Sequence, residues 1–436
     1  MTVLQARPAA PSPLSPASAF GRLDATSVLT GYAVLLMAVP NRLVIGPLGG
    51  AGSPAGVLAL ACLLWWTAHQ LGRSAPGAPA PAPVRSALVA FAFAVGASFV
   101  AATVRPIDPQ EFSTATLGLV LLAGWGGVLL VGNDGIASRE RLVVLVRRLV
   151  ALSAGMATLG IVQFLTGETL VDKISVPGLA VNHTQTSLTL REGFSRPSAT
   201  ATHPIEYGAV ITMMLPLALA LAYGDRERSA LRRWVPVAAI GICIPLSISR
   251  SALVAGAVAL VVVLVSWPRA ARAVAGVALL VGSVLMYLLV PGMLGSLLGL
   301  FTRIGSDSSA LSRTGSYDIA GEFVATSPVV GRGFGTFLPA YRILDNQYLG
   351  LAIEIGLVGL TAFLAVLVAA LWCAFRARRA ARDLLGAQLA TGLLAAVAAG
   401  AVNLALFDGL SFSMSAGVLF LVLGLAGASR RLEERP

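Results

Sequence analysis

Charged residues are scarce in this sequence. Asp, Glu, Lys and Arg make up 12% of the 436 residues, whereas 56% are hydrophobic. Soluble globular domains carry about 25% charged residues, so this composition excludes that class. Apolar runs recur along the chain, each of roughly 17–25 residues, the length that crosses a hydrocarbon core of about 30 Å. We therefore expect an all-α polytopic integral membrane protein.

Residues that hold metals or form disulfides are also rare. The chain has three cysteines, Cys62, Cys243 and Cys373, and three histidines. Each cysteine lies in an apolar run, which predicts a buried free thiol. The sequence shows no metal-ligand spacing, no Walker loop, no dinucleotide fingerprint and no serine nucleophile elbow. We therefore expect neither a metal nor another cofactor.

Twelve apolar runs predict transmembrane helices. Their approximate bounds are 28–45, 54–72, 86–104, 112–132, 142–164, 205–223, 234–248, 251–267, 272–290, 346–371, 384–406 and 411–428. Residues 1–27, rich in Pro, Ala and Ser, predict a disordered cytoplasmic tail. The transmembrane domain then covers 28–428, and 429–436 form a second cytoplasmic tail.

The positive charges orient these helices. Of the 31 Lys and Arg residues, 21 fall on the side that holds both termini, which leaves ten on the other side. Short cytoplasmic loops retain Lys and Arg, so both termini are predicted to be cytoplasmic. The basic residues are spread over the loops rather than gathered in a patch, which argues against a nucleic-acid partner.

Two external loops, about 165–204 and 291–345, are much longer than the others. Loops of this length in a compact protein are usually functional. We expect short helices within the second loop, between Phe301 and Gly321.

The end of the first long loop carries Arg191, Arg196 and His203, and Glu206 follows at the start of the next predicted span. Guanidinium groups at an external cavity suit bidentate binding of phosphate oxygens. The alternative is an ordinary polar helix entry, in which Thr202 caps the helix and Pro204 occupies its first turn.

Arg250 lies in a very tight connection between two predicted spans, 234–248 and 251–267. A guanidinium among apolar helices costs at least a few kcal/mol, so it normally has a partner or a function. The alternative is that its side chain reaches outward to the lipid head groups.

The second long loop carries Arg303, Arg313 and three glycines, at 331, 333 and 335, and it ends at Asp345. The glycines predict a flexible turn, since no strand precedes them and no helix follows at once. Asp345 precedes a long apolar helix and is expected to cap it or to act as a general base. Glu354, inside that helix, is expected to pair with an arginine.

Three motifs, in this order, resemble the O-antigen ligase and polymerase superfamily. They are Arg-Pro followed by His-Pro before a span at 196–208, Leu-Ser-Ile-Ser-Arg-Ser at 246–251, and Gly-Arg-Gly-Phe-Gly-Thr-Phe followed by Asp-Asn-Gln-Tyr-Leu-(x)4-Glu-(x)-Gly-Leu-(x)-Gly at 331–359. The similarity covers roughly residues 140–370. The resemblance implies a GT-C-like membrane glycosyltransferase that takes a glycan from an undecaprenyl-pyrophosphate carrier on the outer side of the bacterial cytoplasmic membrane, without metal or nucleotide sugar.

The resemblance also implies roles for single residues. Arg250 matches the serine-arginine motif that holds the pyrophosphate, and Arg313 or Arg303 matches the second arginine of that site. The family's base is a histidine in a His-Asn pair, and Asp345 stands at that position here. Either Asp345 is the base, or His203 has taken that role, or transferase activity has been lost.

The expected partners are the lipid-linked donor, a glycan acceptor, membrane lipids and other polysaccharide-assembly proteins. The motifs do not separate a polymerase from a ligase, and we favour the polymerase. The alternatives are a transporter or flippase that binds an anionic substrate through the same arginines, and a non-catalytic member of a polysaccharide export complex.

Overall fold

The computed structural model describes residues 24–72, 82–182, 188–191, 193–302 and 308–434. Within these ranges the chain forms fourteen α-helices. They are α1 (Ala25–Met37), α2 (Pro54–Leu71), α3 (Pro83–Val104), α4 (Pro109–Gly135), α5 (Arg139–Thr166), α6 (Pro204–Gly224), α7 (Ala230–Leu246), α8 (Arg250–Val265), α9 (Arg269–Leu289), α10 (Met293–Thr302), α11 (Ser308–Thr326), α12 (Gln347–Ala380), α13 (Leu384–Leu406) and α14 (Ser413–Glu433).

A helix occupies each of the twelve predicted spans, which confirms the all-α polytopic class. Nine of the described helices are long and apolar enough to cross a membrane. The other three helices that occupy predicted spans, α1, α7 and α8, are shorter, with 13, 17 and 16 residues. The remaining two helices, α10 and α11, lie in the second long loop, where short helices were expected.

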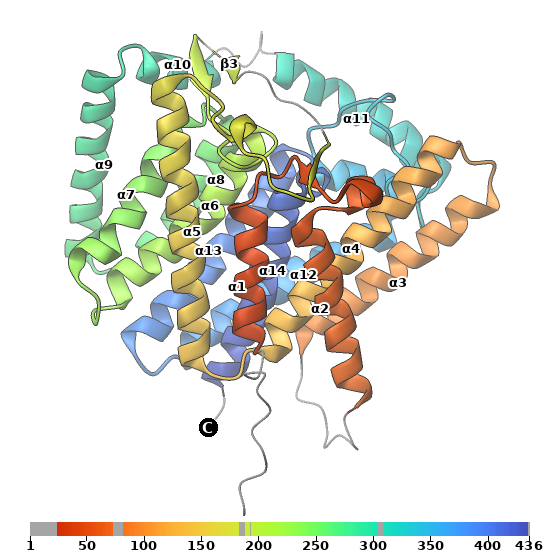
Figure 1. Ribbon diagram of the computed structural model, residues 1–436, viewed down its shortest axis with the longest axis horizontal. Helices are drawn as coiled ribbons and strands as arrows, with labels where there is room; N and C mark the ends of the chain where they lie inside the picture. Colours follow the sequence, from red (N-terminus) through yellow and green to blue (C-terminus); the bar gives the residue numbers. More distant parts are fainter. Residues whose placement is uncertain (1–23, 73–81, 183–187, 192, 303–307, 435–436) are drawn as a thin grey trace, which may run out of the picture.

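Two short antiparallel ribbons and three 3₁₀ helices, η1 (Gly46–Ala51), η2 (Val171–Lys173) and η4 (Gly409–Ser411), complete the described secondary structure. Strand β1 (Leu43–Val44) pairs with β2 (Ala180–Val181), and β3 (Thr189–Arg191) pairs with β4 (Phe194–Arg196). The ribbons, α10 and α11 lie at the upper end of the helix bundle in Figure 1, opposite the C-terminus. The described parts of both long loops therefore gather at one end of the molecule.

Helices α6 and α14 form the centre of the bundle. In each, 94% of the most apolar window is buried, whereas α9 has no buried residue. Small residues permit this close packing: a Cβ at Gly424 of α14 would lie 2.5 Å from the carbonyl oxygen of Leu129 in α4. Helices in membranes commonly approach each other over such residues. The three cysteines are buried and free, as predicted.

Candidate functional site

Arg196 occupies the centre of a basic cluster at the upper end of the bundle. Its side chain is 6% exposed, and its Nε donates a hydrogen bond to the Ser247 carbonyl oxygen at 3.0 Å. Within the described part of the chain, Nη2 of Arg196 is buried and has no hydrogen-bond partner. Burial and the nearby charge of Arg191 lower the pKa of Arg196 to about 10. A buried cation repelled by a second cation is a favourable place for an anion.

Arg250 lies beside the same turn, which connects α7 to α8. It is the first residue of α8, it is 8% exposed, and its Nη1 donates to the Leu300 carbonyl oxygen in α10 at 3.4 Å. The prediction of a buried arginine here is therefore confirmed. The turn is tight enough to hold Ile248 at a φ of +45°, a region that branched residues rarely occupy. Arg303 and the Arg313 side chain lie outside the described residues.

His203 directly precedes α6 and is its N-cap, so the cap is not Thr202, as the alternative of an ordinary polar helix entry had it. The Nδ1 of His203 accepts a hydrogen bond from the Ile205 amide at 3.2 Å. Burial, and then the charge of Arg196, lower the pKa of His203 to about 4. The imidazole is therefore neutral near pH 7, and one ring nitrogen is already occupied by the helix.

Glu206 is completely buried and joins two helices. Its carboxylate accepts hydrogen bonds from the Thr202 amide at 2.9 Å and hydroxyl at 2.8 Å, and from the Met414 amide at 2.8 Å. Met414 lies in the first turn of α14, where the N-cap Phe412 provides no side-chain bond. Glu206 thus satisfies donors that α14 would otherwise leave open, and its side chain has no exposed surface for a glycan.

Asp345 ends the second long loop in a left-handed conformation, with φ of +49°. Aspartate tolerates this region better than most residues. The cap of α12 is Asn346 and not Asp345: its Oδ1 accepts from the amides of Tyr348 and Leu349 at 3.0 and 3.3 Å. The carboxylate of Asp345 is therefore not the helix cap.

Asp408, between α13 and α14, lies in the field of Asp345. Burial, and then the negative charge of Asp345, raise the pKa of Asp408. The two segments are joined by Gln347, whose Oε1 accepts from the Leu410 amide at 2.8 Å. Aromatic contacts also connect the Asp408 segment to His203. The Phe407 ring, next to Asp408 in the chain, lies 5.7 Å from the Phe412 ring, which lies 6.0 Å from the His203 ring.

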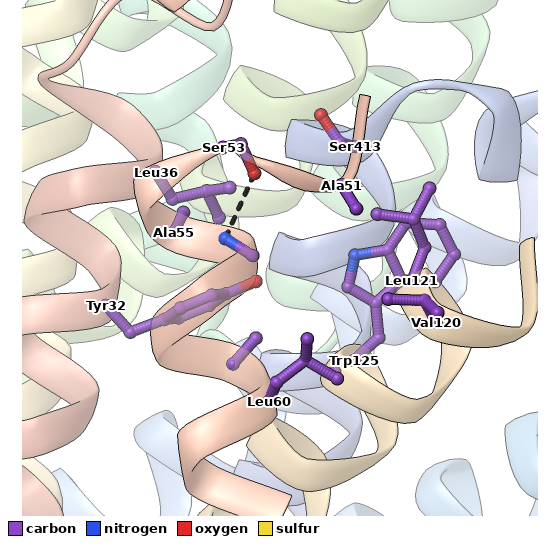
Figure 2. Close-up of a pocket in the computed structure, with 13 residues that line it drawn as sticks. Tyr32, Leu36, Ala51, Ser53, Ala55, Leu60, Val120, Leu121, Trp125 and Ser413 are labelled. Carbon is purple, nitrogen blue, oxygen red and sulfur yellow. Dashed lines mark hydrogen bonds between the residues drawn. The ribbon is translucent and has the colours of Figure 1, made fainter. Parts of the chain in front are cut away.

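A cavity of about 280 Å³ opens beside these carboxylates. It lies between α4, α12, the loop of residues 334–344 and the Asp408–Ser411 segment, and its lining includes Arg342, Asn346, Asp408 and Glu354. A second void, beside Tyr32 and Trp125 (Figure 2), holds only about 10 Å³. That is about the room of one water molecule, so of these two cavities in the described part of the chain the larger is the one that can take a sugar.

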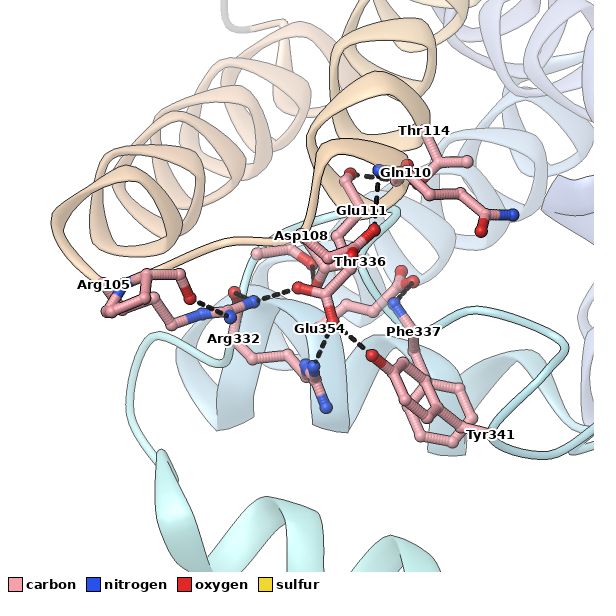
Figure 3. Close-up of polar contacts among 12 residues, drawn as sticks. Arg105, Asp108, Gln110, Glu111, Thr114, Arg332, Thr336, Phe337, Tyr341 and Glu354 are labelled. Atoms are coloured by element: carbon pink, nitrogen blue, oxygen red, sulfur yellow. Dashed lines mark hydrogen bonds and ion pairs between the residues drawn. The ribbon is translucent and has the colours of Figure 1, made fainter.

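Glu111 clamps the loop that lines this cavity (Figure 3). Its carboxylate pairs with Arg332 at 2.6 Å and Arg105 at 2.7 Å, and it accepts a hydrogen bond from the Tyr341 hydroxyl at 2.6 Å. The Arg332 guanidinium lies 5.0 Å from the centres of both the Phe323 and Tyr341 rings. Both ends of the 332–341 loop are thus tied to α4.

The glycine turn at 331–335 is closely packed, so the prediction of a flexible turn is wrong. All three glycines have positive φ. A Cβ at Gly331 would lie 2.3 Å from the Glu354 carbonyl oxygen, and one at Gly335 would lie 2.9 Å from that of Thr114. Only glycine allows the turn to press against α12 and α4 in this way.

Glu354 was expected to pair with an arginine, but Arg332 pairs with Glu111 instead. The Glu354 Oε1 accepts a hydrogen bond from the Phe337 amide at 3.3 Å.

The sequence analysis did not identify Glu111, Arg342 or Asp408 as site residues. The sequence did contain a signal for Glu111. Its carboxylate stands directly at the start of an apolar run, and such a group at a membrane edge needs a partner. Among the described residues no group of three or more His, Cys, Asp or Glu could hold a metal ion.

The fold and the polar groups at one end define a polytopic membrane protein with a buried basic cluster beside a cavity rich in carboxylates. Residues 235–364 match the model of the O-Antigen ligase family. This segment is therefore similar to an O-antigen ligase domain, which supports the resemblance to the O-antigen ligase and polymerase superfamily and a role in surface polysaccharide assembly. Arg250 and Asp345 lie inside the matched segment, and Arg196 and His203 precede it. No curated protein matches the chain.

Proposed function

We propose that this protein is a glycosyltransferase that transfers a glycan from a lipid-pyrophosphate donor to a sugar acceptor at the outer face of the bacterial cytoplasmic membrane. In this orientation both termini are cytoplasmic, because most of the positive charges lie on the same side of the membrane as the termini. A polymerase is favoured over a ligase. The observation that carries the proposal is the buried cluster of Arg196 and Arg250 around the α7–α8 turn.

This cluster suits the pyrophosphate of the donor. Arg196 is buried with an unpartnered Nη2 among the described groups, and a diphosphate supplies oxygens to such donors in bidentate geometry. Arg250 and Arg191 add positive charge beside it, and we assign Arg313 or Arg303 to the same site by the family resemblance. Preorganised positive charge stabilises the leaving pyrophosphate as its negative charge grows, which is where most of the rate enhancement arises.

Asp345 is the base in this proposal. The Nδ1 of His203 accepts a hydrogen bond from the Ile205 amide, so the neutral imidazole carries its proton on Nε2. Neither ring nitrogen of His203 is then free to accept a proton from the acceptor hydroxyl group. Asp345 is partly exposed and is adjacent in the chain to Asn346, which lines the cavity. Glu206 has no substrate contact in this proposal because it is buried between α6 and α14.

The reaction is a single displacement. The acceptor hydroxyl oxygen forms a bond to the anomeric carbon, its proton passes to Asp345, and the bond from the anomeric carbon to the phosphate oxygen breaks. The lipid pyrophosphate leaves with the electron pair and is held by the arginines. Attack from the face opposite the leaving group inverts the anomeric configuration.

Purified protein in liposomes with a lipid-linked oligosaccharide tests this function. A new glycosidic bond in the product, detected by mass spectrometry, is the expected result. The Arg196→Ala and Arg250→Ala variants should lose about 10²–10³-fold in rate, and the exposed Arg226→Ala variant, on the α6–α7 connection, should not. Substrate that crosses the bilayer without new bonds would instead identify a transporter.

A further inference from the structure

The cavity of about 280 Å³ is lined by two kinds of side chain. Trp125, Phe334 and Phe337 provide aromatic surface. Asn346, Gln347, Asp408 and Ser411 provide polar groups. Sites for small ligands typically combine apolar walls with a few placed polar groups. Sugars match this combination, because their C–H faces pack on aromatic rings and their hydroxyl groups both donate and accept hydrogen bonds.

The two amide side chains have defined orientations. The Oδ1 of Asn346 accepts from backbone amides of α12, and the Oε1 of Gln347 accepts from the Leu410 amide. Each side chain therefore turns its oxygen to the backbone and keeps its NH₂ group as the donor for a ligand. Asp408 contributes acceptor oxygens to the same cavity. Donors and acceptors are thus both fixed before a ligand binds.

The charges of the cavity select among sugars. Asp408 and Glu354 line it together with one cation, Arg342, whose Nε also donates to the Ser316 hydroxyl at 3.3 Å. A third carboxylate, Asp345, directly precedes Asn346 in the chain. Carboxyl groups outnumber the one guanidinium, so an acidic sugar has fewer favourable partners here than a neutral one.

The cavity is held in shape without a ligand. Glu111 binds Arg332 and Tyr341, at the two ends of the loop that provides Phe334, Phe337 and Arg342. The glycine turn presses the start of the same loop against α12. A preformed site loses less conformational entropy when it binds.

We infer that this cavity is the acceptor site and that it binds a neutral sugar ring, with Asp408 hydrogen-bonded to a hydroxyl group of that ring. The inference rests on the proposed function for the acceptor role. It divides the outer face into a basic half for the pyrophosphate of the donor and an acidic half for the sugar that is attacked.

The test uses the full chain in nanodiscs with no donor present. Methyl β-galactopyranoside and its 6-carboxylate analogue are titrated separately, and binding is followed by saturation-transfer NMR. The neutral glycoside should bind and the acidic one should not. Asp408→Asn should weaken the neutral glycoside about tenfold, the value of one charged hydrogen bond. The matched Asp318→Asn variant, at an exposed position on α11, should leave binding unchanged.

A second measurement does not depend on Asp408. Ser411 is exposed and lines the cavity, whereas all three native cysteines are buried. The neutral glycoside should slow maleimide labelling of a Ser411→Cys variant but not of an Asp318→Cys variant. Equal or tighter binding of the acidic glycoside, or no protection at position 411, would overturn the inference. If the neutral glycoside binds and no glycosidic bond ever forms with donor present, the transferase proposal fails while the sugar site stands.

Discussion

The Nε of Arg196 lies 3.0 Å from the carbonyl oxygen of Ser247, so a ribbon of the first long loop is fixed to the turn that leads into Arg250. Fifty-one residues separate the two partners in the chain. This one bond brings two predicted site segments together. It also orients a buried guanidinium whose Nη2, within the described residues, has no hydrogen-bond partner.

Arg196→Lys is expected to lower the transfer rate about tenfold or more, although the charge is retained. Lysine has no planar fork, so it cannot bind the Ser247 carbonyl oxygen and two phosphate oxygens at once. The rate is measured with lipid-linked oligosaccharide in liposomes, with Arg226→Lys as the control. A wild-type rate in Arg196→Lys would exclude a bidentate role.

Asp345→Asn is expected to reduce transfer by about 10²–10⁴-fold, the usual contribution of a general base. His203→Asn is expected to retain most of the activity, because asparagine also caps helices well. Both rates are measured in the same liposome assay, at equal amounts of folded protein. The reverse pattern, with a strong loss only at position 203, would assign the base to His203.

The stability of the protein is expected to fall as the pH is lowered from about 6.5 to about 4. Burial lowers the pKa of His203 from 6.5 to about 4 in the folded state, so in this range the unfolded chain binds the additional proton and protonation favours unfolding. Below about pH 4 both states are protonated and this dependence ends. Melting temperatures of wild type and His203→Asn are compared across this range, and the wild type should lose more. Parallel curves would contradict the burial of a neutral imidazole.

Glu111→Gln is expected to destabilise the protein by about 3–5 kcal/mol, because it leaves Arg332 without its buried partner. Tyr341→Phe removes only one hydrogen bond to the same carboxylate and should cost about 1 kcal/mol. Thermal unfolding in detergent, followed by tryptophan fluorescence, compares the two variants. Equal effects would show that the ion pair does not hold the loop.

Glu206→Ala is expected to lower stability by about 1–3 kcal/mol, the cost of leaving the buried amide of Met414 without an acceptor. The transfer rate per folded molecule should be unchanged, since the Glu206 carboxylate bonds only to Thr202 and the start of α14 among the described groups. Unfolding temperature and rate are measured on the same preparation. A raised KM for either substrate at full stability would give Glu206 a binding role.

The helices were predictable because hydrophobic length is a local property of the sequence. Each of the twelve predicted spans holds a helix, since a helix is the one local way for the backbone to satisfy its hydrogen bonds in a membrane. The first span was predicted too long, because α1 ends at Met37 and β1 follows. The position of Arg250 in a tight turn between two apolar runs likewise predicted its burial. The helix N-caps were harder to predict. The caps are His203 and Asn346 and not the expected Thr202 and Asp345, because the exact residue at which a helix starts is uncertain by one or two positions in the sequence.

The sequence by itself determined the membrane class, the helices and the family motifs, because these depend on composition and on short spacings along the chain. The tertiary structure alone decided which polar residues share a site. Glu111 and Arg332 are 221 residues apart, and Glu206 and Met414 are 208 apart, so no spacing in the sequence could pair them. Their pairing follows from helix packing, which brings distant segments to one end of the bundle. Each buried carboxylate then forms hydrogen bonds with the donors that the packing places beside it.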